Sequence, residues 1–146
     1  ILLAILFAEP DADEARAAWT AGEHRIASVL LAAETLVVLR RAHAAARPAQ
    51  GPGWLIERER TRATLLEEAH LLDVDAAILE TLAVHRELSG CRTLDAIHLA
   101  TALNVRDAGF GSDVVVASLD RPMRRMARKL RFRLLPATLP RTGGPE

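Results

Sequence analysis

Apolar residues in the first half of the chain recur every three or four positions, which is the spacing of an amphipathic helix. Residues that disfavour helical backbone mark where these stretches end. Glu9 is followed by Pro10, which pushes it out of the helical region, and Gly22 suits the left-handed turn after a helix. The pattern predicts helices at 2–8, 12–21, 28–46 and 54–70, a strand at 25–27 and a loop at 47–53, with the last two helices paired as a hairpin.

The second half of the chain alternates short apolar runs with helices. Positions 114–117 are uniformly apolar, which is typical of a strand buried on both faces of a parallel sheet. Asp75 and Thr93 stand where a helix needs a capping side chain. Short strands separated by helices predict an α/β fold of three layers, with helices flanking a short, mainly parallel sheet. Strands are expected at 71–74, 114–117 and 132–135, and helices at 75–88, 93–107 and 120–130.

Length and composition describe one globular domain. A chain of 146 residues, half of them hydrophobic, buries enough surface to fold without disulfides or structural metals. We expect the domain at 1–136 and a flexible tail, rich in proline and glycine, at 137–146. Two Trp, three Phe and no Tyr are too few for a platform that stacks RNA bases. Any hold on nucleic acid is therefore expected to be electrostatic or metal-based.

Two further features bear on location. The single cysteine, Cys91, cannot form an intramolecular disulfide, which favours a reducing compartment, the cytoplasm. The apolar run at 1–8 has no basic segment before it and is far short of the roughly 20 residues that span a bilayer. We therefore expect a soluble protein with no membrane association. The chain begins with Ile1 inside a predicted helix, and we expect further residues to precede it.

The formal net charge of zero conceals a basic segment near the C-terminus. No acidic residue lies between Asp120 and Glu146. Five basic residues of this segment are spaced so that one helix would carry them on a continuous face, opposite its apolar positions. Such a face suits the phosphates of RNA, and a solvated face without a ligand is the ordinary alternative. The five are Arg121, Arg124, Arg125, Arg128 and Lys129.

Three carboxylates stand where they could carry chemistry. Glu34 lies on the apolar stripe of its helix, where an unpartnered charge is costly. A boundary position with access to solvent, or a pairing with Arg41, would also explain it. Asp95 lies in the first turn of an otherwise apolar helix, where the helix dipole alone favours an acid. His98, one turn later on the same face, is either a supporting group or an ordinary core histidine.

The third carboxylate, Asp120, follows a predicted strand and precedes Pro122, so Asp120 or Ser118 is expected to cap the next helix. The carboxyl ends of parallel strands are also where open α/β sheets place their sites. Such a sheet could bring Glu34, Asp95 and Asp120 to one edge. Oxygen ligands without cysteine or paired histidine suit Mg²⁺ or Mn²⁺. Clustered acids beside a basic face are what cleavage of a phosphodiester needs.

Four segments of the chain resemble PIN domains of the VapC toxin type. The most specific is TLDAIHLATAL at 93–103. The segment VVASLDRPM at 115–123 is similar to the family's strand and Thr-x-Asp-Arg turn, with Ser118 in place of the Thr. LLAILFAEP at 2–10 is similar to the family's first helix, and 28–39 to the helix that carries its Glu. The likeness extends from residue 1 to about residue 136.

The resemblance implies a PIN-like fold and a metal-dependent endoribonuclease that uses Mg²⁺ or Mn²⁺. It also implies an RNA substrate, a cognate antitoxin protein that blocks the site, and a homodimer. The family's first strand and first catalytic Asp precede the helix matched at 2–10, and both are absent from this sequence, by truncation, disorder or real loss. The corresponding acids are Glu34, Asp95 and Asp120, with Ser118 and His98 as supporting groups.

Two other functions remain open. A PIN-fold module without catalysis would bind RNA or a protein through the basic C-terminal helix. An inert scaffold would dimerise through the apolar helical hairpin that includes 54–70. Metal-dependent cleavage distinguishes the enzyme from both, and salt-sensitive RNA binding distinguishes the module from the scaffold.

Overall fold

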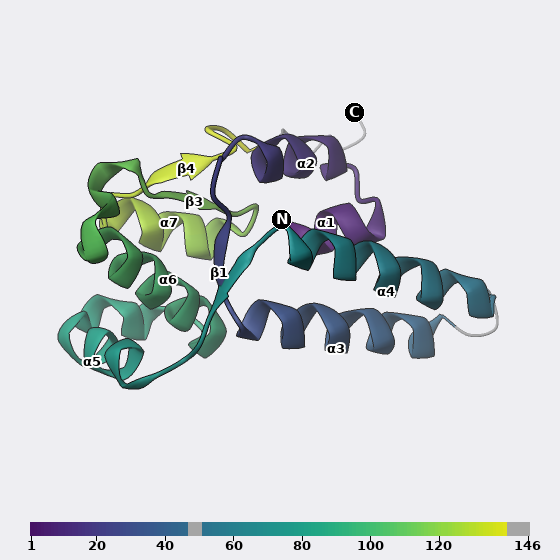
Figure 1. Cartoon of the computed structure of the whole chain (residues 1–146), viewed down its shortest axis with the longest axis horizontal. Helices are drawn as coiled ribbons and strands as arrows, with labels where there is room; N and C mark the ends of the chain where they lie inside the picture. The colour runs from purple at the N-terminus through teal and green to yellow at the C-terminus, as the bar shows by residue number, and fades with distance from the viewer. Residues whose placement is uncertain (47–50, 140–146) are drawn as a thin grey trace, which may run out of the picture.

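The computed structural model describes residues 1–46 and 51–139, in which short strands lie among helices (Figure 1). The helices are α1 (Leu2–Phe7), α2 (Ala12–Thr20), α3 (Leu30–Ala45), α4 (Pro52–Glu67), α5 (Ala76–Val84), α6 (Thr93–Val105) and α7 (Arg121–Lys129). The strands are β1 (Ile26–Ser28), β2 (His70–Leu72), β3 (Val115–Ala117) and β4 (Arg133–Leu135).

The strands pair in parallel, two by two. Ile26 of β1 lies opposite His70 of β2, and Val115 of β3 lies opposite Arg133 of β4. Parallel neighbours need a crossover, which α3 and α4 supply for the first pair and α7 supplies for the second. The predicted α/β class, with short parallel strands flanked by helices, is confirmed. Within the described residues, however, the strands form two separate sheets instead of the single sheet expected.

The helices α3 and α4 lie side by side as a long hairpin, as predicted (Figure 1). Arg62 on α4 donates to the Thr35 hydroxyl at 3.0 Å and to the Ala32 carbonyl at 2.6 Å, both on α3. Arg40 and Glu59 pair across the hairpin at 2.9 Å. The base of the hairpin packs with α1 and α2 around one hydrophobic cluster, which includes Leu2, Ile5, Leu6, Trp19, Leu39 and Leu65.

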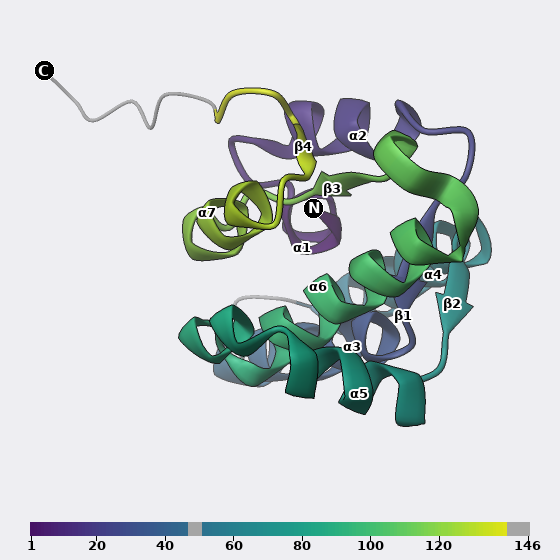
Figure 2. The same ribbon diagram turned by 90° about the vertical axis from the view of Figure 1, so that its left-hand side faces the viewer.

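The helix α6 is the centre of a second hydrophobic cluster. Its residues Leu99 and Leu103 are fully buried, and the cluster continues into α5, β3 and α7. The same helix also packs against β1, so it joins the two halves of the molecule (Figure 2). The other large members of this cluster are Ile78, Leu88, Val116, Met126, Leu130 and Phe132.

Capping side chains explain two helix starts. The Asp75 carboxylate accepts hydrogen bonds from the backbone of Ala77 at 3.0 Å and Ile78 at 3.3 Å, and caps α5 as predicted. Thr93 does not cap α6, because it is itself the first helical residue. Arg92 occupies the capping position without a side-chain hydrogen bond to the backbone. The predicted cap at Thr93 is therefore wrong by one residue.

Two helices end earlier than their apolar patterns predict. α5 ends at Val84 and a 3₁₀ turn, Arg86–Gly90, follows it, so Leu88 still reaches the core outside the helix. α6 ends at Val105, and Gly109 in the following turn adopts a φ of 114°, which side-chain-bearing residues rarely reach. Burial therefore continues past the end of α5 at Leu88, whereas none of the residues in the turn after α6 is buried.

Two sequence predictions lie partly outside the described residues. Of the loop at 47–53, residues 47–50 are outside the described part, and α4 already begins at Pro52. Of the tail at 137–146, residues 140–146 are outside it. In the described portion, no helix combines the length and apolar character needed to cross a membrane.

Candidate active site

Three helices position the three predicted acids. Glu34 lies in the second turn of α3, directly after β1. Asp120 precedes α7 and follows β3. Asp95 lies in the first turn of α6, the helix that packs against β1 and forms the second core with α7. Segments far apart in the chain therefore carry these acids to neighbouring parts of the fold.

His98 on α6 faces Glu34 on α3. The His98 Nε2 and Glu34 Oε2 atoms are 3.6 Å apart, slightly beyond hydrogen-bond distance. The Nε2 atom is buried and has no hydrogen-bond partner among the described residues. The Glu34 side chain is 33% exposed, so this carboxylate lies at the edge of solvent. Its nearest basic group is thus His98, and no ion pair between Glu34 and Arg41 occurs in the part of the chain that the structure describes.

The charges of Asp120 and Glu34 both act on Asp95. Burial raises the pKa of the Asp95 carboxyl, and the carboxylates of Asp120 and, more weakly, Glu34 raise it further. The positive charges of Arg92 and His98 oppose this change in pKa. Neighbouring like charges disfavour ionisation, and this effect weakens with distance. Asp95 therefore lies within electrostatic range of both Asp120 and Glu34.

The thiol of Cys91 lies close enough to two of these acids to be affected by their charge, which the sequence did not indicate. Burial raises the pKa of the Cys91 thiol, and Asp95 and Asp120 raise it further, which keeps the thiol protonated. No local sequence signal marks this proximity, because it arises only from tertiary packing.

Asp120 also has a structural role. Its Oδ1 atom accepts a hydrogen bond from the Met123 backbone at 2.7 Å and caps α7, as predicted. The hydroxyl of Ser118 accepts a hydrogen bond from the Asp120 backbone at 3.1 Å, and Ser118 is buried. Ser118 therefore holds the turn that presents Asp120. Because an ionised carboxylate has about four lone-pair sites, the cap leaves capacity for another ligand.

Arg124 is not on the exposed basic face, and the prediction that placed it there is wrong. Its side chain is 1% exposed. The guanidinium donates to the carbonyls of Ser118 at 2.7 Å and Pro136 at 2.8 Å, with longer hydrogen bonds to Leu135 and Ala137. The four carbonyls lie at or just after the carboxyl ends of β3 and β4, and the buried guanidinium supplies their hydrogen bonds. The members of the face that are exposed are Arg121, Arg125, Arg128 and Lys129.

The three carboxylates have the chemistry to bind a hard divalent cation, but in this structure they are not arranged closely enough to coordinate one. Carboxylate oxygens are the ligands of Mg²⁺ and Mn²⁺, and a cation would relieve the repulsion that raises the pKa of Asp95. Within residues 1–46 and 51–139, no group of three His, Cys, Asp or Glu side chains is close enough to hold a metal ion. A metal bound here would therefore need side-chain movement, further ligands or water in its coordination shell.

Comparison with known families agrees with the fold. The model of the PIN domain family matches residues 1–129, a span that includes all three acids and α7. No match to the chain was found among curated proteins or among solved structures. PIN domains are generally nucleases, and they typically use divalent metals such as Mg²⁺. With a match over most of its length, the chain belongs to the PIN domain family.

Proposed function

We propose that the protein is a metal-dependent endoribonuclease, a toxin of the VapC type that hydrolyses RNA phosphodiester bonds in the cytoplasm. The observation that supports this best is the raised pKa of Asp95, which burial causes together with Asp120 and Glu34. Perturbed carboxyl groups near the ends of parallel strands are typical of functional sites. Membership of the PIN family supplies the nuclease class, and the toxin role rests on the sequence resemblance.

In this proposal, Glu34, Asp95 and Asp120 hold Mg²⁺ or Mn²⁺. The metal supplies a water activated for attack and positive charge against the phosphate. One of the three carboxylates would relay a proton during the reaction, as the resemblance to the family implies. His98 orients Glu34 from 3.6 Å, and Ser118 holds the Asp120 turn through its hydroxyl. The three carboxylates thus share the binding of the metal, and His98 and Ser118 support Glu34 and Asp120.

The partners in this proposal follow from charge and from the resemblance. The exposed side chains of Arg121, Arg125, Arg128 and Lys129 hold the RNA backbone beside the acids. A cognate antitoxin protein blocks the site, and the protein forms a homodimer. These two protein partners are carried over from the VapC-type family alone.

The proposed activity is tested by incubating purified protein with RNA in the presence of a chelator. We expect no cleavage under these conditions and recovery when Mg²⁺ or Mn²⁺ is added in excess, because the carboxylates alone repel the phosphate. The measurement is the appearance of RNA fragments on a denaturing gel. Undiminished cleavage in excess chelator would contradict the metal-dependent mechanism.

Replacing both Arg125 and Arg128 with Glu is expected to weaken RNA binding. The slope of log affinity against log salt should fall by about 0.7 for each phosphate that the variant no longer neutralises. Both side chains are exposed, so the fold should be preserved. The measurement is RNA affinity in chelator over a series of salt concentrations. Arg60→Glu, on the exposed surface of α4, serves as the control and should keep the slope. An unchanged slope in the double variant would show that the basic face does not bind RNA and is either solvated or in contact with the antitoxin.

A further inference from the structure

Four backbone carbonyls converge on the guanidinium of Arg124, where β3 and β4 end. Its Nη1 atom donates to the carbonyls of Ser118 at 2.7 Å and Leu135 at 3.3 Å. Its Nη2 atom donates to the carbonyls of Pro136 at 2.8 Å and Ala137 at 3.2 Å. Among the residues that the structure describes, no carboxylate lies within 4.0 Å of this guanidinium. The buried charge is therefore compensated by carbonyl dipoles and not by an ion pair.

Arg124 holds the turn of Asp120 on both sides. Its guanidinium binds the carbonyl of Ser118, two residues before Asp120, and its backbone N–H donates to the Asp120 carbonyl at 2.9 Å. Inside this turn, the Asp120 backbone donates to the Ser118 hydroxyl, and the Met123 backbone donates to the Asp120 carboxylate. One arginine thus anchors the backbone before and after the acid.

The side-chain contact matters most at the Ser118 carbonyl. No other group in residues 1–46 and 51–139 donates a hydrogen bond to this oxygen. The Leu135 carbonyl, by contrast, also accepts one from the Ser118 backbone at 2.9 Å. Because a guanidinium is a planar fork, its two outer nitrogens can bind Ser118 after β3 and Pro136 after β4 at the same time. A shorter or apolar side chain would release the turn while the β3–β4 pairing remains.

We propose that Arg124 is a positioning residue for the active site, which fixes the Ser118–Met123 turn and thereby holds the Asp120 carboxylate where the metal binds. A ligand that is fixed before the metal arrives has less freedom to lose on binding. The metal-binding role of Asp120 rests on the proposed function, whereas the hold on its turn rests on hydrogen bonds of the fold alone. This role also accounts for the burial of one arginine in a helix whose other basic residues are exposed.

The hold on the turn is tested by amide hydrogen exchange in chelator, with Arg124→Ala compared with the wild type. We expect the amides of Asp120 and Met123 to exchange at least about tenfold faster, relative to the amides of Leu99 and Leu103 in the same protein. Those two residues are buried in α6, so their exchange reports any loss of overall stability. The ratio of the two rates therefore isolates the turn from a general destabilisation.

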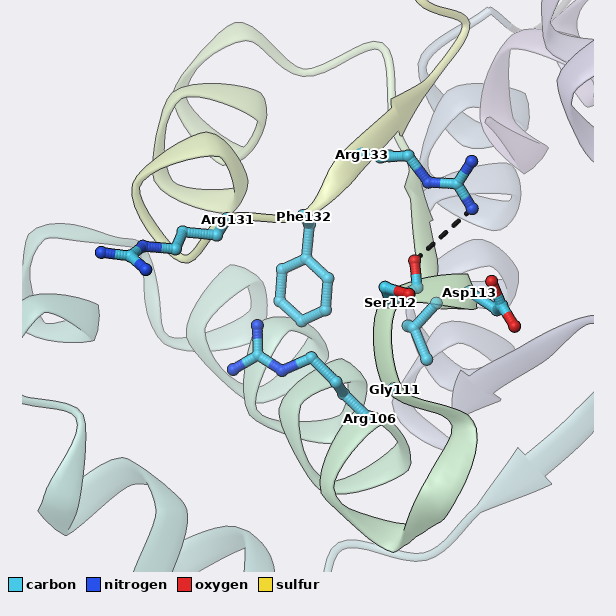
Figure 3. Close-up of a pocket in the computed structure, with 8 residues that line it drawn as sticks. Arg106, Gly111, Ser112, Asp113, Arg131, Phe132 and Arg133 are labelled. Carbon is cyan, nitrogen blue, oxygen red and sulfur yellow. Dashed lines mark hydrogen bonds between the residues drawn. The ribbon is translucent and has the colours of Figure 1, made fainter.

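The matched control is Arg106→Ala. Arg106 also anchors a backbone carbonyl, that of Leu130 at 2.8 Å, and its side chain lies beside the Phe132 ring just before β4 (Figure 3). Its loss should leave the exchange ratio of the Asp120 turn unchanged. Should Arg124→Ala not fold, Arg124→Lys replaces it, since lysine keeps the charge but has one nitrogen and cannot bridge both strand ends. An unchanged exchange ratio in the folded Arg124 variant overturns the proposal.

A second measurement connects the turn to the metal. Calorimetric titration of Mn²⁺ into the folded Arg124 variant should show an affinity at least about fivefold lower than that of the wild type, because a support of a metal ligand is lost. Arg106→Ala should keep the wild-type affinity. Faster exchange of the Asp120 turn with unaltered Mn²⁺ affinity overturns the positioning role. If the wild type itself binds no Mn²⁺, the proposed function fails, and the exchange ratio alone decides whether Arg124 holds the turn.

Discussion

Replacing Asp95 with Asn is expected to lower RNA cleavage by at least about 100-fold while the fold survives. The amide keeps the shape of the carboxyl but removes the charge that binds the metal. Removal of a group that only supports a ligand commonly costs 10- to 100-fold, so removal of a ligand should cost more. The measurement is the initial rate of cleavage at saturating Mn²⁺. Asp13→Asn is the matched control, because Asp13 is likewise in the first turn of a helix, α2, and should retain full activity.

The same variant should be more stable than the wild type near neutral pH in the absence of metal. The pKa of Asp95 in the folded state lies above its ordinary value of 3.8, so the folded state holds the proton more tightly than the unfolded state does. The stability of the wild type therefore falls as the pH rises from about 3.8 through the folded-state pKa. Asn does not titrate and avoids this decrease. Thermal melts of both proteins across pH measure this decrease in stability. A lower melting temperature for Asp95→Asn than for the wild type at pH 7 would contradict the claim that the charge of Asp95 destabilises the fold.

Replacing Arg124 with Met is expected to destabilise the protein strongly. The change removes donors from four backbone carbonyls at the ends of β3 and β4. The Leu135 carbonyl keeps a hydrogen bond from the Ser118 backbone at 2.9 Å and Ala137 is exposed, so the loss falls mainly on the carbonyls of Ser118 and Pro136. Each buried acceptor left unpaired costs about 1–3 kcal/mol, so we expect a net destabilisation of about 2–4 kcal/mol. For a domain of this size, that corresponds to a fall in Tm on the order of 10 °C.

The matched control for this variant is Arg128→Met. Arg128 lies one turn later on α7 and is exposed, so its replacement removes the same charge without uncovering carbonyls. Its Tm should change by no more than about 2 °C. Equal stability of the two variants, measured by denaturant unfolding, would show that Arg124 contributes no more than a surface arginine does.

Sequence patterns predicted the helices well because capping and periodicity are local properties. The caps at Asp75 and Asp120 and the α3–α4 hairpin are confirmed. The pairing of strands was less predictable, since strands of three residues carry too few side chains to specify their neighbours. The two separate parallel pairs depend on how the helices pack, which no single segment encodes.

The residues of the candidate site likewise differ in how well the sequence predicted their positions. The spacing placed Glu34 on the apolar stripe that its helix should bury, with a boundary position as the alternative. The structure agrees with the boundary position, because Glu34 is 33% exposed and the buried residues of α3 are Thr35, Leu39 and His43.

The burial of Arg124 could not be read from spacing, because an arginine among other arginines looks exposed. Its position is determined by carbonyls from distant segments, including Leu135 and Pro136. Burial of an arginine inside a basic stripe is therefore visible only in three dimensions.

The central claim is that Glu34, Asp95 and Asp120 bind one metal site together. It is tested most directly by calorimetric titration of Mn²⁺ into the wild-type protein and into Glu34→Gln, Asp95→Asn and Asp120→Asn. Asn is also a good helix cap, so Asp120→Asn removes a metal ligand while the start of α7 should stay intact. We expect each change to weaken the same binding event at least about tenfold, with Asp13→Asn unaffected. Mn²⁺ binding that is unaltered in any one of the three variants would contradict a shared site.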